Sequence, residues 1–252
     1  LNQGDSGELL GSGGTGGSKS LMATGTALDA AADVVIEKGR KWAGHVLEAA
    51  VEDIEFLSGE FKVVGTDKVI PLMDLAIKVM ETEEVPDDLP DNLNAKLTAD
   101  SPPSAFPNGC HVCEVEIDPA TGQVRVDRYT AVDDFGVVIN QPIVDGQVHG
   151  GIVQGLGQVL MEDAWYDQDG QLLAGSFMDY AMPRASDMPS FGVSEHPVPA
   201  TTNILGVKGV GEAGTSGSIP STMIAILDAL KPLGVTDIPM PATPERVWQA
   251  IQ

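Results

Sequence analysis

Residues 113–126 read CEVEIDPATGQVRV, and this stretch decides the fold class of the 252-residue chain. Apolar side chains occupy every second position, at 113, 115 and 117 before DPATG and at 124 and 126 after it. Such alternation places apolar side chains on one face of a strand and polar ones on the other. The stretch therefore predicts an antiparallel hairpin with one buried face and a tight turn at residues 118–122.

Helical patterns surround this hairpin. Residues 28–36 and 71–80 carry apolar side chains at helical spacing, and residues 54–63 suggest a short hairpin between them. Residues 129–139 are expected to form a further strand, kinked at an Asp-Asp pair, and residues 219–230 and 243–251 read as helices. Because strands and helices do not alternate regularly, the order predicts an α+β fold rather than a doubly wound sheet.

The chain is expected to have two lobes. Acidic residues and prolines crowd residues 81–108 without periodicity, which is typical of a linker or a long surface loop. This division predicts an N-terminal lobe over residues 1–80 and a larger C-terminal lobe over residues 109–252. Residues 149–161 (HGGIVQGLGQVLM) are apolar with four glycines, so another element is expected to approach them closely.

Composition restricts the function classes. The formal net charge is −23, with 37 acidic against 14 basic residues, and such a surface repels nucleic-acid backbones. The sequence contains no run of about 18 apolar residues, so it predicts no membrane-spanning helix. Residues 4–20 are rich in glycine and serine and lack the pattern of a signal peptide, so we interpret the chain as a fragment or a processed piece. Without a disulfide framework the cytoplasm is the expected compartment, with the periplasm as the alternative.

The two cysteines form a C-x-x-C pair, Cys110 and Cys113. Redox chemistry and half a metal site are two interpretations of such a pair. A strand pattern puts the two thiols on opposite faces, and no second pair completes a four-thiolate cluster. Two small, half-buried side chains are the simpler interpretation, and no role is assigned to them.

Three segments are rich in glycine: residues 13–20 (GGTGGSKS), 150–158 (GGIVQGLGQ) and 206–217 (GVKGVGEAGTSG). Each exposes backbone N–H groups without steric cover, as binding a phosphate or a flat polar heterocycle requires. Each is also compatible with an ordinary loop. None has the phosphate-loop ending, and the G-x-G-x-x-G at positions 209, 211 and 214 lacks a preceding βαβ strand.

Glu212 lies inside the third glycine-rich segment. Its neighbours allow two interpretations, an exposed turn glutamate or a carboxylate enclosed by glycines and suited to act as a base. The surroundings alone favour the first. The four histidines are scattered without a metal-binding spacing, and no G-x-S-x-G motif indicates a hydrolase.

Taken together and in order, these segments resemble the molybdopterin-binding large subunits of the molybdenum hydroxylases, the xanthine dehydrogenase and aldehyde oxidase family. The resemblance rests on GTGGSKS (14–20), PNGCHVCEVEIDPATGQVRVDRY (107–129), VDDFGVVINQPIVDGQVHGGIVQGLGQVLMED (132–163), GVKGVGEAGTSG (206–217) and MPATPERVW (240–248). It covers nearly the whole chain. One departure is the sequence INQP at residues 139–142, where the family has I-N-P; others are Ser216, Ser218 and Ile219, where it commonly has small apolar residues.

The resemblance implies a molybdenum–pterin cofactor, in its cytosine dinucleotide form, whose dithiolene holds the metal without protein ligands. It implies that Glu212 is the catalytic base, that Gln154 reaches the cofactor near the metal and that Lys208 flanks the loop. Five further residues are implied to contact the pterin or its phosphates: Thr15, Gly16, Gly17, Ser18 and Ser20.

The resemblance also implies the reaction. An aldehyde or an N-heterocycle is hydroxylated with water as the oxygen source, and electrons pass to iron–sulfur and FAD partner subunits. Carbon monoxide is the alternative substrate, and a non-catalytic cofactor-binding or assembly module is the alternative function. The chain corresponds to the C-terminal part of such a subunit, so its N-terminal half is an expected partner and the chain alone is expected to be inactive.

Overall fold

The structure is a computed structural model that describes residues 5–8 and 14–252. It contains two compact units, one made of Leu1–Gly13 and Ala23–Ser101 and the other of Gly14–Met22 and Pro102–Gln252. The prediction placed the first glycine-rich segment in the N-terminal lobe, whereas its described part groups with the second unit; Gly13 lies outside the described residues. Residues 82–107 contain neither helix nor strand.

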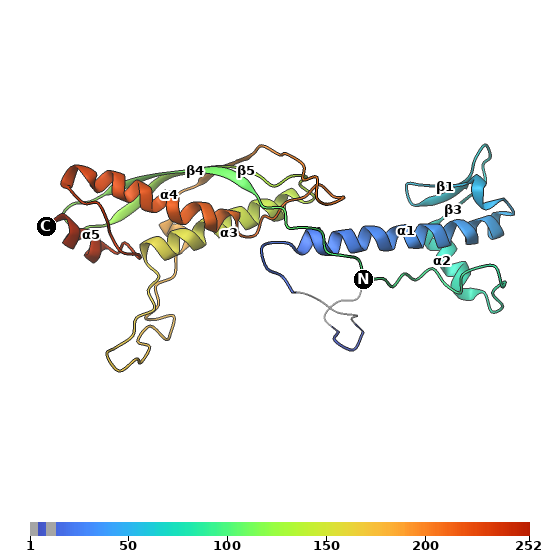
Figure 1. The fold of residues 1–252 in the computed structure, drawn as a ribbon, viewed down its shortest axis with the longest axis horizontal. Helices are drawn as coiled ribbons and strands as arrows, with labels where there is room; N and C mark the ends of the chain where they lie inside the picture. The colour runs from blue at the N-terminus through green and yellow to red at the C-terminus, as the bar shows by residue number, and fades with distance from the viewer. Residues whose placement is uncertain (1–4, 9–13) are drawn as a thin grey trace. The chain divides into compact units, whose positions relative to one another are not determined.

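The first unit combines two helices with a small sheet (Figure 1). Helix α1 covers Ser20–Leu47, and its first three residues group with the second unit. Strands β1 (Ile54–Leu57), β2 (Glu60–Val63) and β3 (Val69–Pro71) pair antiparallel in that order, and α2 (Leu72–Glu81) follows. The buried Phe61 ring packs against Gly39 of α1, where a Cβ would lie 2.2 Å from it. The ring occupies the space that a side chain at position 39 would need, which explains why a glycine stands inside the helix.

The second unit contains the predicted hairpin. Strands β4 (Asn108–Ile117) and β5 (Val124–Asp134) pair antiparallel, which confirms the hairpin and its turn. The predicted separate strand over residues 129–139 was wrong in its bounds, since β5 is one strand that ends at Asp134 and the chain turns at Gly136 with φ +65°. Strand β6 (Phe191–Glu195) pairs parallel to β5 and was not predicted.

Helices α3 (Gln141–Leu160) and α4 (Ala213–Leu230) pack closely against each other. A Cβ on Gly155 would lie 1.9 Å from Ser218 Oγ, and one on Gly214 would lie 2.6 Å from the Val148 carbonyl oxygen. The expected close approach at residues 149–161 is therefore confirmed. Helix α4 begins before the predicted residue 219, because its first turns consist of small residues that this packing favours.

The core of the second unit lies between the sheet and these helices. One buried cluster joins Tyr129 and Phe135 to α3, and another joins α4 to α5 (Pro244–Ile251). Asn140 caps the N-terminus of α3, where its side chain accepts a hydrogen bond from the Ile143 N–H, and Pro142 of the INQP sequence lies in the first turn. No helix within the described ranges has the length and apolar character needed to cross a bilayer.

Candidate functional site

The first glycine-rich segment forms an unusual loop just before α1. Gly14, Gly17 and Ser18 have φ values of +68°, +63° and +54°, in the left-handed region. For Ser18 this conformation costs about 1–2 kcal/mol, so the surrounding contacts must hold it. Among the residues that the structure describes, none lies within 4 Å of a Cβ built on Gly16 or Gly17. The loop therefore presents open backbone surface within this unit.

Ser18 and Glu212 hold each other through two hydrogen bonds. The Ser18 hydroxyl donates to Glu212 Oε2 at 2.8 Å and accepts from the Glu212 backbone N–H at 3.1 Å. The residues are 194 positions apart in the sequence. The pair joins the first and third glycine-rich segments and orients one carboxylate oxygen of Glu212.

Glycines allow the two segments to approach. A Cβ on Gly209 would lie 2.8 Å from Ser18 Cβ, and one on Gly211 would lie 3.3 Å from Ser18 Oγ and 3.4 Å from Gln147 Oε1. The Gly209 N–H donates to the Ala105 carbonyl at 2.9 Å. A side chain at position 209 would therefore displace Ser18 and break the pairing with Glu212.

Glu212 stands directly before α4 and is exposed in this structure. Of the two interpretations drawn from its neighbours, the structure thus shows the exposed carboxylate and not the enclosed one. One turn later, the Thr215 hydroxyl lies 3.2 Å from Gln154 Oε1 and 3.0 Å from the Gly151 carbonyl. This contact brings the second glycine-rich segment next to the third.

Lys208 is paired with Asp134. The amine contacts Asp134 Oδ2, and both side chains are largely buried. Burial would raise the pKa of Asp134, but hydrogen bonds from Lys208 and from the backbone N–H groups of Val198 and Gly136 hold it below its ordinary value. The charge of Lys208 is therefore compensated by Asp134.

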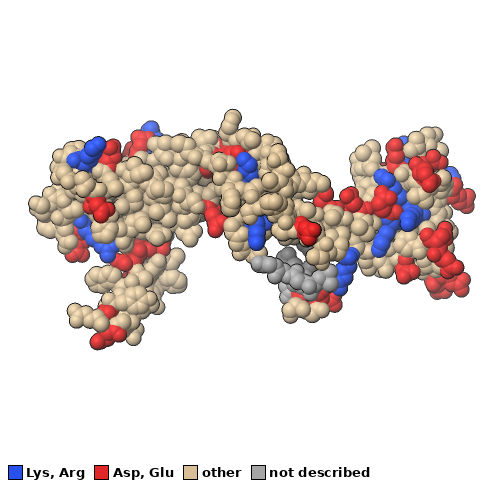
Figure 2. Space-filling view, viewed as in Figure 1, with Lys and Arg blue, Asp and Glu red and all other residues tan. Residues whose placement is uncertain are grey.

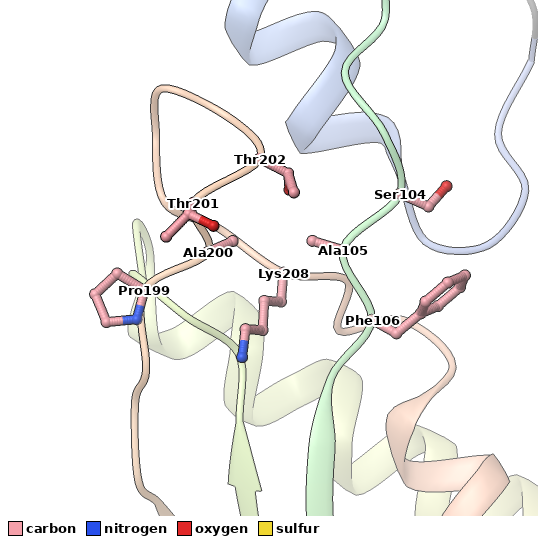
Figure 3. A pocket seen from close by; sticks show the side chains of 8 residues that line it. All are labelled: Ser104, Ala105, Phe106, Pro199, Ala200, Thr201, Thr202 and Lys208. Atoms are coloured by element: carbon pink, nitrogen blue, oxygen red, sulfur yellow. The ribbon is translucent and has the colours of Figure 1, made fainter.

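Lys208 also lines a cavity of about 290 Å³ (Figure 3). Its other lining residues mix hydroxyl groups with apolar side chains: Ser104, Ala105, Phe106, Pro199, Ala200, Thr201 and Thr202. Figure 3 shows the Lys208 side chain extending away from Ser104 and Thr202. The volume lies near the lower end of the range for ligand pockets, about 300–1,000 Å³, and suits one polar group rather than a whole dinucleotide.

The structure thus brings some of the predicted site residues of different segments into contact, while others pair with residues of their own segment. Ser18 meets Glu212, whereas Thr15 and Ser20 pair with each other at 2.6 Å between their hydroxyl oxygens. Sequence reasoning missed Asp134, Thr215 and Gln147, which have no local pattern that marks them. Among residues 5–8 and 14–252, no group of three His, Cys, Asp or Glu side chains is placed to hold a metal.

The cysteines remain outside this site. Cys110 is exposed rather than half-buried as expected, and Cys113 is partly buried on the other face of β4. Burial raises the pKa of the Cys113 thiol. That shift disfavours the reactive thiolate form of Cys113.

The site offers open backbone, hydroxyl groups, an amide and a carboxylate from three glycine-rich segments. The molybdopterin cofactor-binding domain family matches residues 1–189 of the sequence. The chain belongs to this family. The match includes the first two glycine-rich segments and ends before Glu212.

Relatives extend the match over the third segment. The chain is 36% identical over 240 residues to the carbon monoxide dehydrogenase large chain of Hydrogenophaga pseudoflava, covering 95% of this chain and 30% of that one. It is 36% identical over 239 residues to the nicotine 6-hydroxylase large subunit of Paenarthrobacter nicotinovorans, covering 94% and 29%. These relatives are oxidoreductases, and the chain spans less than a third of their length.

The solved structures agree with the sequence relatives. The quinoline 2-oxidoreductase of Pseudomonas putida 86 matches with a TM-score of 0.83 and 34% identity, covering 94% of this chain and 30% of that one. A Cu,Mo-containing carbon monoxide dehydrogenase matches with a TM-score of 0.82 and 33% identity, over 94% and 30%. The α+β fold predicted from the order of elements is therefore that of molybdenum-cofactor-binding proteins.

Proposed function

We propose that this chain is the C-terminal, cofactor-binding part of the large subunit of a molybdenum hydroxylase. The complete enzyme oxidises an aldehyde or an N-heterocycle with water as the oxygen source, and it passes electrons to iron–sulfur and FAD subunits. The observation that supports this most is the Ser18–Glu212 pair, which positions a carboxylate next to an open glycine loop in a molybdopterin-binding family.

The loop before α1 suits the molybdenum–pterin cofactor in its cytosine dinucleotide form. No atom of residues 5–8 or 14–252 lies within 4 Å of a Cβ built on Gly16 or Gly17, so these residues leave room for a bulky planar or phosphate group at the backbone N–H groups there. Thr15, Ser18 and Ser20 add hydroxyl groups, and Gln154 and Lys208 add an amide and an amine. When bound, the cofactor supplies the metal that takes up two electrons from the substrate; its own dithiolene would hold that metal.

Glu212 is assigned as the base. The Ser18 hydroxyl holds Oε2, so Oε1 is the oxygen that accepts the proton of the water-derived nucleophile. The Glu212 backbone N–H is tied to the same hydroxyl, so the side chain and the backbone are oriented together. This arrangement reduces the motion that a proton acceptor must lose before the transfer.

Two alternatives concern the substrate and the activity. Some relatives are named for carbon monoxide and others for the N-heterocycles nicotine and quinoline, so both substrate classes are candidates. A non-catalytic cofactor-binding or assembly module is the second function. It shares the cofactor loop but needs no base at position 212.

The test uses this chain assembled with the N-terminal part of the large subunit and the iron–sulfur and FAD subunits. Molybdenum content and cytidine nucleotide released by acid are measured first. Turnover with an aldehyde, an N-heterocycle and carbon monoxide is then measured with a dye acceptor. We expect about one molybdenum and one cytidine nucleotide per chain and turnover of one substrate class. A loaded complex without any turnover would favour the assembly module, and a complex without molybdenum would exclude both.

A further inference from the structure

An apolar arm projects from the second unit between α3 and β6 (Figure 1). We define it as residues 164–182. Its large apolar side chains are mostly exposed, above all Phe177 at 86% and Met178 at 93%. Five others are also exposed: Trp165, Tyr166, Leu172, Leu173 and Met182. So many exposed aromatic and aliphatic side chains in one segment are unusual unless the segment is an interaction surface.

The arm is ordered despite this exposure. Tyr166 and Leu172 form a β-bridge, the Leu173 N–H donates to the Trp165 carbonyl at 2.7 Å, and Asp167 accepts from the backbone of residues 169 and 171 at 2.9 Å. The backbone of the hairpin is therefore held by its own hydrogen bonds while its side chains face outward. A two-stranded hairpin has marginal stability by itself, so burial of its exposed side chains against another surface would stabilise it further.

The base of the arm is fixed to the rest of the second unit. The Tyr180 hydroxyl donates to Glu162 Oε2 at 2.7 Å, and Asp163 forms an ion pair with Arg246 of α5 at 2.8 Å. These contacts restrict the motion of the arm at its base. This lowers the entropy that binding a partner would otherwise cost.

Charge indicates the kind of partner. Residues 164–182 contain three aspartates and no lysine or arginine, and the arm's surface is mostly uncharged in Figure 2. Its counterpart should therefore be an apolar surface with a neutral or basic border. An acidic surface is disfavoured as the counterpart of the arm. A second copy of this chain, with its net charge of −23, would offer mostly such a surface.

The relatives contain much more protein than this chain does. The match to the carbon monoxide dehydrogenase large chain covers 240 of the 252 residues, so it cannot leave out the whole arm, and it covers only 30% of that large chain. Solved relatives that superpose on 94% of this chain likewise contain a polypeptide more than three times as long. In these relatives the segment equivalent to the arm exists together with a large body of additional protein.

We infer that the arm is the docking surface for the remaining part of the large subunit, through an apolar recess that receives Phe177 and Met178. This inference rests on the proposed function, since it takes the chain to be part of a large subunit. The area around these two side chains would become buried on assembly, and exclusion of water there would hold the second unit in place.

The test is a binding titration of the 252-residue chain. The probe is the large-subunit segment that the relatives carry outside the matched region, produced from the same genome as a separate tagged protein. The double variant Phe177→Asp/Met178→Asp is compared with Leu57→Asp/Met80→Asp, whose side chains are exposed to a similar extent, 74% and 85%, in the other unit. We expect the arm variant to raise the Kd by at least about 30-fold, the effect of losing central anchors, and the control to change it by less than about threefold.

A second measurement follows oxidation of the same side chains by hydroxyl radicals. Met178 should be oxidised rapidly in the chain alone and protected in the complex, while Met80 should react equally in both. Equal affinity of the arm variant and wild type, an absence of binding by the wild type, or loss of binding by the control would overturn the inference. Light scattering that shows an arm-dependent dimer of the chain itself would also overturn it, since a second copy would then be the occupant.

The cofactor separates this inference from the proposed function. A complex that forms through the arm but never contains molybdenum would refute the proposed function and leave the docking surface standing. If the arm variant formed a molybdenum-loaded complex as well as wild type does, the docking surface would be refuted and the proposed function would stand.

Discussion

Ser18 and Glu212 constrain each other so closely that a substitution at either position affects both the carboxylate and the backbone. Glu212→Gln is the cleaner change, because the amide oxygen still accepts the Ser18 hydroxyl while basicity is lost. In the assembled enzyme we expect unchanged molybdenum content and a rate of substrate-dependent reduction per molybdenum lowered by about 10²–10⁴, the usual contribution of a general base.

Glu245→Gln makes the same chemical change at an exposed position of α5 and serves as the control, with no expected effect on that rate. If Glu212→Gln instead lowered molybdenum content and left the rate per molybdenum within about threefold of wild type, Glu212 would have a structural role only.

Gly16 tests the cofactor loop more sharply than Gly17. Gly17 has φ +63°, so any side chain there is strained regardless of a ligand. Gly16 is not in the left-handed region, and a Cβ there meets none of the described residues within 4 Å. Gly16→Leu should therefore leave the thermal midpoint of the chain unchanged while blocking cofactor loading in the assembled enzyme, measured as molybdenum per complex.

The matched control is Gly146→Leu on α3, where a side chain also meets open space. Full molybdenum content in Gly16→Leu would assign this loop to a linker without cofactor contacts. A midpoint lowered equally in both variants would indicate a general effect of leucine rather than a blocked approach.

At the scale of elements, contact between α3 and α4 depends on glycine. A side chain at Gly155 would meet Ser218 Oγ at 1.9 Å, so Gly155→Ala should lower the free energy of unfolding by about 1–3 kcal/mol, the usual cost of overpacking. Denaturant unfolding measures this. Gly150→Ala lies on the same helix in open space and should be neutral or stabilising, by up to about 1 kcal/mol.

A second substitution locates the clash. In Gly155→Ala/Ser218→Ala the nearest clashing atom is gone, so part of the lost stability should return. Additive effects of the two substitutions would mean that these helices do not touch at this point.

A buried polar cluster links β4, β5 and α4. The Tyr129 hydroxyl lies 2.7 Å from His111 Nδ1 and 3.1 Å from Ser221 Oγ, and His111 Nε2 lies 3.1 Å from Asp133 Oδ1. Burial raises the pKa of Tyr129 to about 12. The unfolded chain releases this proton near pH 10. The contribution of Tyr129 to stability is therefore complete below about pH 10 and is lost as pH rises towards 12.

Unfolding measured between pH 8 and 12 tests this sign. Tyr129→Phe should reduce the decline of stability above pH 10, although it lowers stability at pH 8 through the lost hydrogen bonds. Tyr166→Phe, at an exposed tyrosine, should leave the decline as in wild type. An identical pH dependence in wild type and Tyr129→Phe would contradict the raised pKa.

At the scale of the whole molecule, the chain spans less than a third of its relatives, and catalysis requires a completely held set of groups around the reacting atoms. We expect the purified 252-residue chain to show no dye-linked oxidation of aldehydes, N-heterocycles or carbon monoxide. Turnover should appear only after assembly with the remaining large-subunit segment and the electron-accepting subunits. Measurable turnover by the chain alone would show that its own groups suffice.

Short-range patterns in the sequence determined much of this protein. Alternation at residues 113–126 predicted the β4–β5 hairpin, helical spacing predicted α2, the middle of α1 and most of α4, and the order of elements predicted an α+β fold. These predictions succeed because period and turn chemistry are local properties of the chain. The three glycine-rich segments, and the family that they resemble, were likewise recognisable without coordinates.

Only the tertiary structure decided which of these segments meet. The contact of Ser18 with Glu212 spans 194 residues, and the pairing of Lys208 with Asp134 spans 74. Strand β6 has five residues and is defined by pairing with β5, and the early start of α4 depends on its packing against α3. These features follow from contacts between distant parts of the chain, whose free energy has no periodic signature in the sequence.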